Sequence, residues 1–402
     1  MVKVEFKKFI QPIVIGVVCL ISFVSYQYYI SFIYTFWPNG GITEFYNFSH
    51  DWHDRFGLSM SDADFEVVAN ENQERVKKAD SIIKESEYGK QRGINTYKEF
   101  KTYESELPEG AILELPKSDQ KERQELREFI QPNEKVFSQI ETFETIIKEK
   151  QSFSSPEVFV KGREINQKEQ EKLTKVLFQN DSWRNILPMY LPDTLASRIS
   201  DMLITILIAL GLLIPSVFVK DTMLKIKATQ WSSKRGRNIV KSQYIATQLW
   251  SLMTITVMLG VFLYPLKNTE FTRYFSSGLN SFLGESWFQG RNYSFLEITF
   301  GSWLCLVILL VYLVGMSFSH ILFFIGQTSR NYLNMLMKVI PMLTVFIILS
   351  SLIFNYAFYL ENKIYQWTGI VNSELYVSLL LLIVSVGIGI TPIFMSKKRE
   401  LK

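Results

Sequence analysis

Six long apolar runs interrupt an otherwise polar chain. They cover residues 9–37, 199–219, 243–265, 297–325, 339–360 and 375–395. A helix of about 20 apolar residues, rising 1.5 Å per residue, crosses the roughly 30 Å hydrocarbon core of a bilayer. Only two charged residues, Asp201 and Glu297, lie within the runs, and both lie near run ends. The pattern predicts an all-α polytopic membrane protein with six transmembrane helices.

The first run could be read either as a cleaved signal peptide or as a first span. It is about twice as long as a typical signal-peptide apolar region, and it lacks a small-residue cleavage site. It ends in the aromatic residues Tyr34, Phe36 and Trp37, which are typical of a membrane interface. We therefore expect an uncleaved first span.

Basic residues gather in the short segments on one side of this topology. Segments 1–8, 220–242, 326–338 and 396–402 together hold 16 basic and 3 acidic residues. Because an excess of Lys and Arg in short loops marks the cytoplasmic side, both termini are predicted to be cytoplasmic. The expected location is the cytoplasmic (plasma) membrane, as a multi-pass protein.

This topology divides the chain into three parts. Residues 1–37 form the cytoplasmic N-terminus and first span, 38–198 form an extracellular domain, and 199–402 form a five-helix membrane domain. The segment 38–198 is long enough to bury a core of its own. The membrane domain contains the longest of the cytoplasmic segments, 220–242.

The extracellular segment is predicted to be mainly helical. Apolar residues at three- and four-residue spacing predict helices over Ala63–Glu87, Asp119–Ile130, Glu134–Lys148 and Gln167–Leu177. A short strand is also possible at Val158–Val160, in which case the domain would be α+β.

Composition removes several functional classes. The two cysteines, Cys19 and Cys305, both lie inside apolar runs, so they do not form a secreted disulfide scaffold. A formal net charge of +4 gives no basic surface for nucleic acid once the cytoplasmic segments are accounted for. The segregation of charge excludes a soluble enzyme, and no G-x-S-x-G, S-x-x-K or C-x-x-C motif occurs. We expect no catalytic residue on this chain.

One local cluster invites a metal interpretation. His50 and His53 stand three residues apart beside Asp51 and Asp54, so on a helix they would share a face. No third histidine lies outside the membrane on this topology, and no H-E-x-x-H pattern occurs. We predict solvated side chains here and no metal site.

The cytoplasmic segment 220–242 is more than a run of positive charge. Its apolar residues suit one side of a short amphipathic helix on the membrane surface, and they are Met223, Leu224, Ile226 and Trp231. A turn follows at Ser232-Ser233, and Gly236 can supply a positive φ. The alternative is a loop that only sets topology. Trp231 and the length of the segment argue for a packed contact.

This order of residues resembles a known motif. An acid, an amphipathic turn, Trp-Ser-Ser, Gly-Arg and a basic residue before the next span are similar to the cytoplasmic loop after the second span in type-2 ABC-transporter permeases. The layout resembles the subgroup with a large extracellular domain between spans one and two. The topological resemblance covers the whole chain, and the motif covers only 221–241. The chain departs from the common pattern in having Asp221 rather than Glu and no Pro in the turn.

The resemblance implies both site residues and partners. In that family the stretch is a coupling helix that sits in a cleft of a separate ATPase subunit. Carried over by position, the residues that would contact or position the ATPase are Asp221, Lys225, Trp231, Ser233, Gly236 and Arg237. A second permease subunit, identical or related, would complete the transport pathway.

The chain itself has no route to ATP hydrolysis of the P-loop type. No G-x-x-x-x-G-K-[ST] sequence occurs, so ATP and Mg are expected on the partner ATPase and no cofactor is expected on this chain. The predicted partners are therefore a P-loop ATPase, a second permease subunit and the lipid bilayer, without nucleic acid.

Polar residues and prolines within the runs are candidates for the pathway or its gating. Glu297 opens the fourth run, His320 lies near its cytoplasmic end, and Pro341 is expected to kink the fifth span. The alternatives are an interfacial acid at a helix N-terminus, an interfacial histidine and an ordinary kink.

A further proline and three amides have expected structural roles. Pro215 is expected to kink the second span. Gln27, Gln243 and Asn355 are suited to hydrogen bonds between helices.

The preferred function is the membrane-spanning subunit of an ATP-driven ABC exporter, with a peptide or an antimicrobial as cargo. The alternative is a membrane sensor or immunity protein that binds an extracellular ligand without an ATPase. A sensor would ordinarily carry a cytoplasmic output domain, and the sequence contains none. A membrane-bound enzyme is disfavoured because paired intramembrane acids and histidine clusters are absent.

Overall fold

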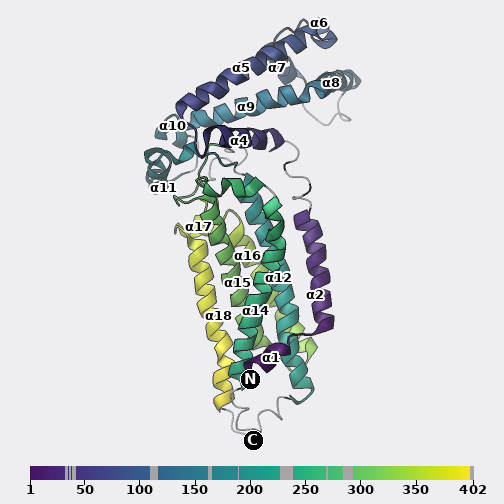
Figure 1. Ribbon diagram of the computed structural model, residues 1–402, viewed down its shortest axis with the longest axis vertical. Helices are drawn as coiled ribbons and strands as arrows, with labels where there is room; N and C mark the ends of the chain where they lie inside the picture. Colours follow the sequence, from purple (N-terminus) through teal and green to yellow (C-terminus); the bar gives the residue numbers. More distant parts are fainter. Residues whose placement is uncertain are drawn as a thin grey trace.

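The computed structural model consists of helices joined by short connections (Figure 1). It describes residues 1–31, 35, 38, 42–108, 116–161, 165–188, 190–226, 239–268, 270–283 and 293–398. Within these residues every regular element is a helix, and β-pairing occurs only as two isolated bridges. The prediction of an all-α protein is confirmed.

Six helices are long and apolar enough to cross a membrane. They are α2 (Pro12–Ser25) continued by the π-helix η1 (Tyr26–Ser31), α12 (Tyr190–Met223), α14 (Ile239–Leu263), α15 (Phe300–Thr328), α16 (Tyr332–Phe354) and α18 (Ser373–Lys398). They correspond to the six apolar runs, so the prediction of a multi-pass membrane protein is confirmed.

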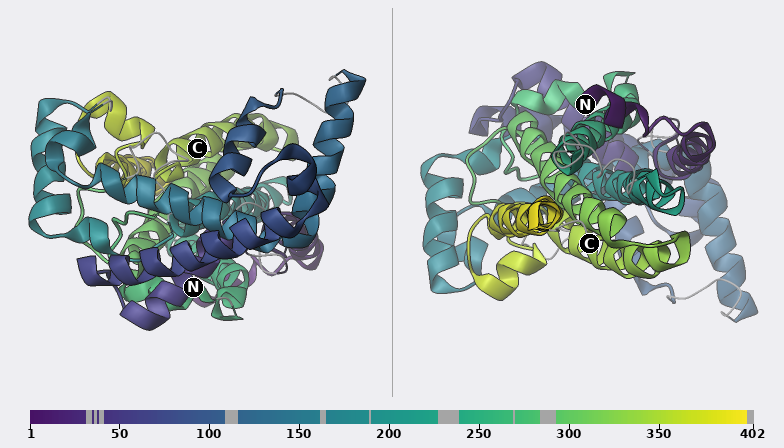
Figure 2. Two further views of the ribbon diagram at one scale, coloured as in Figure 1. Left: turned by 90° about the horizontal axis from the view of Figure 1, so that it is seen from above. Right: turned by 90° about the horizontal axis from the view of Figure 1, so that it is seen from below.

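The bundle has two central helices. In α12, 83% of the most apolar window is buried, and in α15 the share is 72%, whereas α2 with η1 buries only 6%. Viewed along the bundle, α14, α16 and α18 surround the central pair, and α2 lies at the edge (Figure 2). The outer helices therefore present most of their apolar surface to lipid.

α12 is longer than a bilayer requires. Its 34 residues extend about 50 Å at 1.5 Å per residue, well beyond a 30 Å hydrocarbon core. The run 199–219 occupies only its middle. Leu191 and Leu195, before the run, are buried in the main hydrophobic core. One continuous helix thus joins the membrane bundle to the domain that precedes it.

The domain between the first and second spans, here called the inserted domain, lies at one end of the bundle (Figure 1). Its helices are α4 (Thr43–Phe56), α5 (Asp62–Glu85), α6 (Glu87–Arg92), α7 (Tyr97–Glu106), α8 (Lys117–Ile130), α9 (Glu134–Ser152), α10 (Pro156–Val160) and α11 (Gln167–Thr174). Short turns η4 (Gln131–Asn133), η5 (Lys175–Gln179) and η6 (Ser182–Arg184) complete it. The N-terminus and the end of α18 lie at the opposite end of the bundle.

Side-chain caps explain several helix starts in this domain. Ser61 and Asp64 form a reciprocal capping box at the start of α5, and Thr96 with Glu99 does the same for α7. α6 ends at Gly93, whose φ of 68° is a left-handed conformation that glycine adopts without a steric penalty.

The strand considered for Val158–Val160 is wrong. These residues belong to the short helix α10, which begins with Pro156 at its first position. The Ser155 side chain accepts a hydrogen bond from the Val158 backbone N–H. A proline whose φ already suits a helix, preceded by a serine cap, outweighed the β-branched residues.

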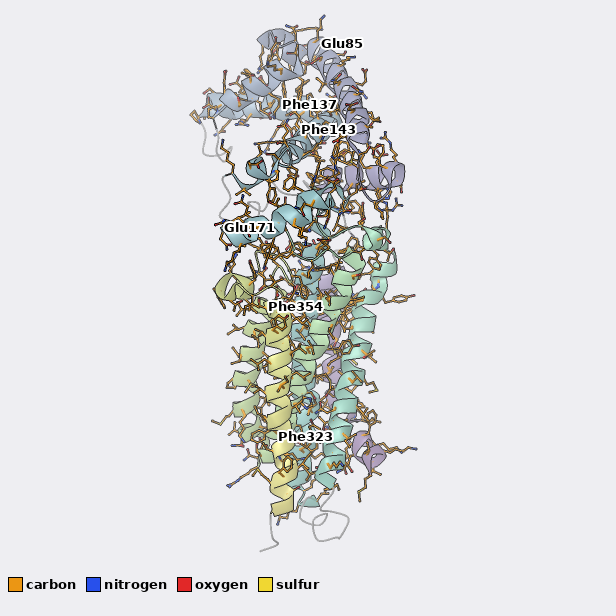
Figure 3. The ribbon with its side chains drawn as sticks, turned by 90° about the vertical axis from the view of Figure 1, so that its left-hand side faces the viewer. Glu85, Phe137, Phe143, Glu171, Phe323 and Phe354 are labelled. Atoms are coloured by element: carbon orange, nitrogen blue, oxygen red, sulfur yellow. The ribbon has the colours of Figure 1, made fainter. Side chains whose placement is uncertain are left out.

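The inserted domain has two hydrophobic cores. A distal core of α5 to α9 is separate from the main core and holds Ala79, Ile83, Tyr88, Ile94, Tyr97, Phe100, Leu107, Leu126, Phe129, Phe137 and Ile140. The main core is continuous with that of the membrane bundle. The boundary falls within α9, between Phe137 in the distal core and Phe143 in the main core (Figure 3).

Contacts at the base of the inserted domain hold it to the bundle. The ring of Trp52 on α4 stacks on Phe282 at a centroid distance of 6.3 Å. The hydroxyls of Ser49 and Tyr274 are 3.0 Å apart, and Arg273 forms an ion pair with Asp54. Tyr274 and Phe282 come from the connection between α14 and α15, so this connection is the seat of the inserted domain.

Candidate functional site

Asp221 lies at the end of α12 and is buried. The Lys8 ammonium donates a hydrogen bond of 2.6 Å to Asp221 Oδ2 and lies 3.0 Å from Glu5 Oε2. Burial acts to lower the pKa of Lys8, but the hydrogen bonds and charges of Asp221 and Glu5 outweigh it and raise the pKa above its usual value. Lys8 is therefore charged, and it neutralises the carboxylate that ends the central helix.

The N-terminal helix α1 (Val2–Lys7) is packed in place by aromatic rings. Phe6 meets the Trp250 ring edge-on at 5.1 Å, and Phe9 stacks on the same ring at 5.6 Å. Phe9 also contacts Phe218 on α12 at 6.0 Å. We call the contacts of Lys8 with Asp221, and of these rings with α12 and α14, the N-terminal latch.

The remaining residues of the predicted coupling segment divide into two groups. Lys225 is the second residue after α12, is exposed, and has a positive φ of 56°, which is not helical. Trp231, Ser233, Gly236 and Arg237 lie outside the described residues. The structure therefore describes only the beginning of the segment, which lies at the same end of the bundle as the N-terminus and the end of α18 (Figure 1).

A line of polar contacts joins α14 to α15 within the membrane bundle, and we call it the polar seam. Gln327 Nε2 donates to Gln243 Oε1 (2.8 Å), Tyr244 Oη pairs with His320 Nδ1 (3.0 Å), Ser319 Oγ donates to Gln248 Oε1 (3.2 Å), and Ser251 Oγ pairs with Ser319 Oγ (2.6 Å). The expected interhelical bond of Gln243 is confirmed. The side chains of Gln27 and Asn355 make no such bond to another described helix.

His320 lies inside this seam and is only 6% exposed. Its ring stacks on Tyr244 at 5.5 Å. Its backbone lies against α18, because a Cβ placed on Gly389 would be 3.1 Å from both the Cβ and the carbonyl oxygen of His320. His320 is thus a packed residue between three helices rather than a free interfacial side chain.

The two prolines have different surroundings. Pro341, in α16, is exposed on the outside of the bundle. Pro215, in α12, is buried, and a Cβ on Gly326 of α15 would lie 3.1 Å from its Cα. The described structure brings Pro215, and not Pro341, to the contact between the two central helices.

Glu297 lies just outside the membrane helices. It is exposed and precedes the first residue of α15, Phe300, by three positions. It lines an open cleft between the bundle and the inserted domain. The structure does not bring Glu297, His320 and Pro341 together. They belong to an outer cleft, an interhelical seam and a lipid-facing surface.

His50 and His53 lie on α4, one turn apart. His50 Nδ1 is 3.6 Å from Asp54 Oδ2, and the His53 ring meets Tyr274 edge-on at 5.2 Å. No group of three or more His, Cys, Asp or Glu side chains that could hold a metal ion occurs among the described residues.

Sequence reasoning missed the partners of these residues. The Lys8–Asp221 pair joins positions 213 apart in the chain. The polar residues at 243, 247 and 251 recur at the four-residue spacing of one helix face, a signal that could have indicated the seam.

Comparisons of the chain with family models, with curated proteins and with solved structures found no match.

Proposed function

We propose that this chain is the membrane-spanning subunit of an ATP-driven exporter of the ABC type. Segment 220–241 would couple it to a separate P-loop ATPase that carries ATP and Mg. A second permease subunit would complete the pathway across a plasma membrane. On this proposal both termini are cytoplasmic, the inserted domain is extracellular, and the cargo is a peptide or an antimicrobial.

The observation that carries the proposal is the position of Asp221. It begins the stretch that resembles a coupling helix, it ends the most buried helix of the bundle, and the N-terminal latch holds it there. A push on segment 220–241 would therefore reach the centre of the bundle through α12 directly. Alternating access needs such a rigid connection between the ATPase and the spans.

The orientation has independent support. The N-terminus, the end of α18 and the end of α12 lie at one end of the bundle, and the inserted domain lies at the other (Figure 1). The basic segments 1–8, 220–242 and 396–402 adjoin the first of these ends. The excess of positive charge there favours the cytoplasm.

The test is co-purification of the tagged full-length chain from its host in mild detergent, followed by mass spectrometry. We expect a P-loop ATPase to co-purify, and we expect Trp231→Ala and Gly236→Asp to release it. Trp367→Ala is the matched control, because Trp367 is 69% exposed on α17 (Lys363–Thr368), at the opposite end of the bundle.

Two results would contradict the proposal. One is the absence of any ATPase under conditions that keep the membrane complex intact, which would favour the sensor or immunity protein. The other is equal retention of the ATPase by the Trp231→Ala, Gly236→Asp and Trp367→Ala proteins, which would move the contact away from segment 220–241.

A further inference from the structure

An open cleft of about 760 Å³ lies where the inserted domain meets the bundle. It is lined by residues from four separate stretches, 59–64, 180–185, 276–280 and 296–299. The volume is within the roughly 300–1,000 Å³ range of clefts that bind small ligands. None of the residues considered for the coupling segment contributes to it.

Backbone pairing and hydrogen bonds hold the four stretches of the cleft together. Two isolated antiparallel bridges, Ser59 with Asn185 and Gly278 with Thr299, hold the four stretches together in pairs. The Asn185 side-chain amide donates 3.2 Å to the Asn280 carbonyl and so joins one pair to the other. The cleft is thus preformed by contacts between segments far apart in the sequence.

Asn280 and Gly278, which both line the cleft, are closely packed. Asn280 is 2% exposed, its side chain donates 3.1 Å to the Ser294 carbonyl, and it accepts from the Ser294 N–H at 2.8 Å. A Cβ on Gly278 would lie 2.2 Å from the Asn185 amide nitrogen. A larger residue at position 278 would therefore have to displace the Asn185 side chain from its hydrogen bond to the Asn280 carbonyl.

The charged residues that line the cleft are four acids and one base. Arg184 pairs with Asp62 through two hydrogen bonds of 3.1 and 3.0 Å. Arg184 Nε also lies 3.8 Å from Asp181 Oδ1. Asp181 and Glu297 are exposed and Asp64 is half-buried, and four acids against one base leave the cleft with an excess of negative charge. Asp64 also accepts from the Ser61 backbone, which fixes its carboxylate in position.

Apolar residues also line the cleft. They are Leu296 and Ile298, which are half-buried, and Met60 and Leu279, which are each 1% exposed. A ligand that matches both features carries cationic groups next to apolar ones. The inserted domain would attract such a ligand from a distance, since segment 38–198 holds 30 acidic and 23 basic residues.

We propose that this cleft binds an extended, cationic and partly apolar peptide segment, with a Lys or Arg side chain between Asp64, Asp181 and Glu297. This inference rests on the proposed orientation, which places the cleft outside the cell, and it names the class of peptide that the protein would recognise. The described residues offer no metal-binding group, so a bare metal ion is not the expected occupant.

The test uses the full-length chain in phosphatidylcholine nanodiscs, without ATP or a partner subunit. The probe is a fluorescent six-residue peptide of alternating Lys and Leu, compared with the matching Glu–Leu peptide and with spermine. We expect the Lys–Leu peptide to bind, the Glu–Leu peptide not to bind, and the affinity to fall as salt is raised.

The variant is Asp181→Asn with Glu297→Gln, which removes two negative charges and leaves the shape unchanged. Asn suits position 181 because φ there is 50°, a left-handed conformation that Asn tolerates. We expect a loss of affinity of about tenfold, since each of the two removed charges is exposed and its attraction is screened by solvent. The matched control is Glu106→Gln with Asp119→Asn, an exposed and a half-buried acid of the distal part of the inserted domain.

The outcomes separate this inference from the proposed function. Equal binding by the wild type and the Asp181→Asn, Glu297→Gln protein overturns the cleft site, and so does an equal loss in the control. Binding of spermine as tight as that of the peptide overturns the peptide class. Because the measurement needs no ATPase, failure of the co-purification experiment leaves these results unaffected.

Discussion

At the residue scale, the end of α12 depends on a charge pair. Asp221 is an acid at the boundary of an apolar helix, where an unpaired carboxylate is costly. Lys8 comes from the opposite end of the sequence, and their side chains are 23% and 11% exposed. Removal of Lys8 would leave the buried Asp221 carboxylate without its partner, whereas removal of Asp221 would leave Lys8 with Glu5, 3.0 Å away.

The N-terminal latch gives the first prediction. We expect Lys8→Met to lower the free energy of unfolding by about 2 kcal/mol, less than for a fully buried pair because Lys8 is partly solvated. The N-terminus should also become more sensitive to protease. The measurement is the unfolding temperature in detergent by tryptophan fluorescence, together with limited proteolysis.

The control for this prediction is the double variant Lys8→Met with Asp221→Asn. It removes both charges of the pair, so it should recover part of the stability that Lys8→Met loses. Equal instability of the single and double variants would show that Lys8 acts through Glu5 or through its packing and not through Asp221.

His53 gives a prediction about pH. Burial, followed by the positive charge of Arg273, lowers the pKa of His53 below its usual 6.5. Asp54 and His50 also face it, and Tyr274 packs against its ring. The folded protein favours the neutral imidazole, so this contribution to stability is complete above about pH 6.5 and is lost as the pH falls towards the lower, folded-state pKa.

We therefore expect the unfolding temperature to fall between pH 7 and pH 5, and we expect His53→Gln to reduce that fall. The measurement is the unfolding temperature of both proteins across this pH range. If the wild type and His53→Gln lose stability in parallel, His53 is not the group responsible.

At the element scale, α15 is held between α12 and α18 by close approaches at small residues. Gly389 on α18 brings that helix against the backbone of His320, and Gly326 on α15 brings that helix against Pro215 of α12. Small residues at helix contacts allow helices to pack closely in a membrane. Close packing is important there because lipid tails are as apolar as the side chains, so helix association gains no hydrophobic stabilisation.

Two glycines of α18 provide a matched pair for the next prediction. Gly389→Val should lower the free energy of unfolding by about 1–3 kcal/mol, because even a Cβ there lies 3.1 Å from His320. Gly387→Val should be nearly neutral, because nothing lies within 4 Å of a Cβ at that exposed position. Both are measured as unfolding temperatures in the same detergent. Equal effects would show that α18 does not pack on His320.

At the scale of the whole molecule, the two hydrophobic cores divide the protein into two parts that contribute differently to its stability. The main core runs from the base of the inserted domain through the membrane bundle without interruption. The distal core is held by its own rings, such as Tyr88 stacked on Phe129 at 4.9 Å. The distal part therefore contributes little to the stability of the rest.

Removal of the distal part tests this division. Replacement of residues 77–140 by a short Gly-Ser loop should leave the unfolding temperature of the remaining protein unchanged, because the replaced segment contains the distal core and no residue of the main core. Trp52→Ala, in the main core, should instead cost about 3 kcal/mol or more. A large loss of stability in the deletion protein would contradict the separation of the cores.

The sequence by itself determined the number and approximate position of the spans, the single large insertion and its mainly helical character. These properties depend on local composition: about 20 consecutive apolar residues can only be helical in a bilayer, and charged segments remain outside it. The strand considered at Val158–Val160 is absent because Pro156 and the Ser155 cap favour a helical turn there.

Only the tertiary structure decided which residues meet. All six runs are apolar, so composition did not distinguish the central α12 and α15 from the lipid-facing α2. Lys8 meets Asp221, and four distant stretches form one cleft, because the helices are packed in one particular arrangement. That arrangement depends on the shapes of side chains that face each other. A close approach such as that of Gly389 to His320 involves two helices, so neither sequence segment alone predicts it.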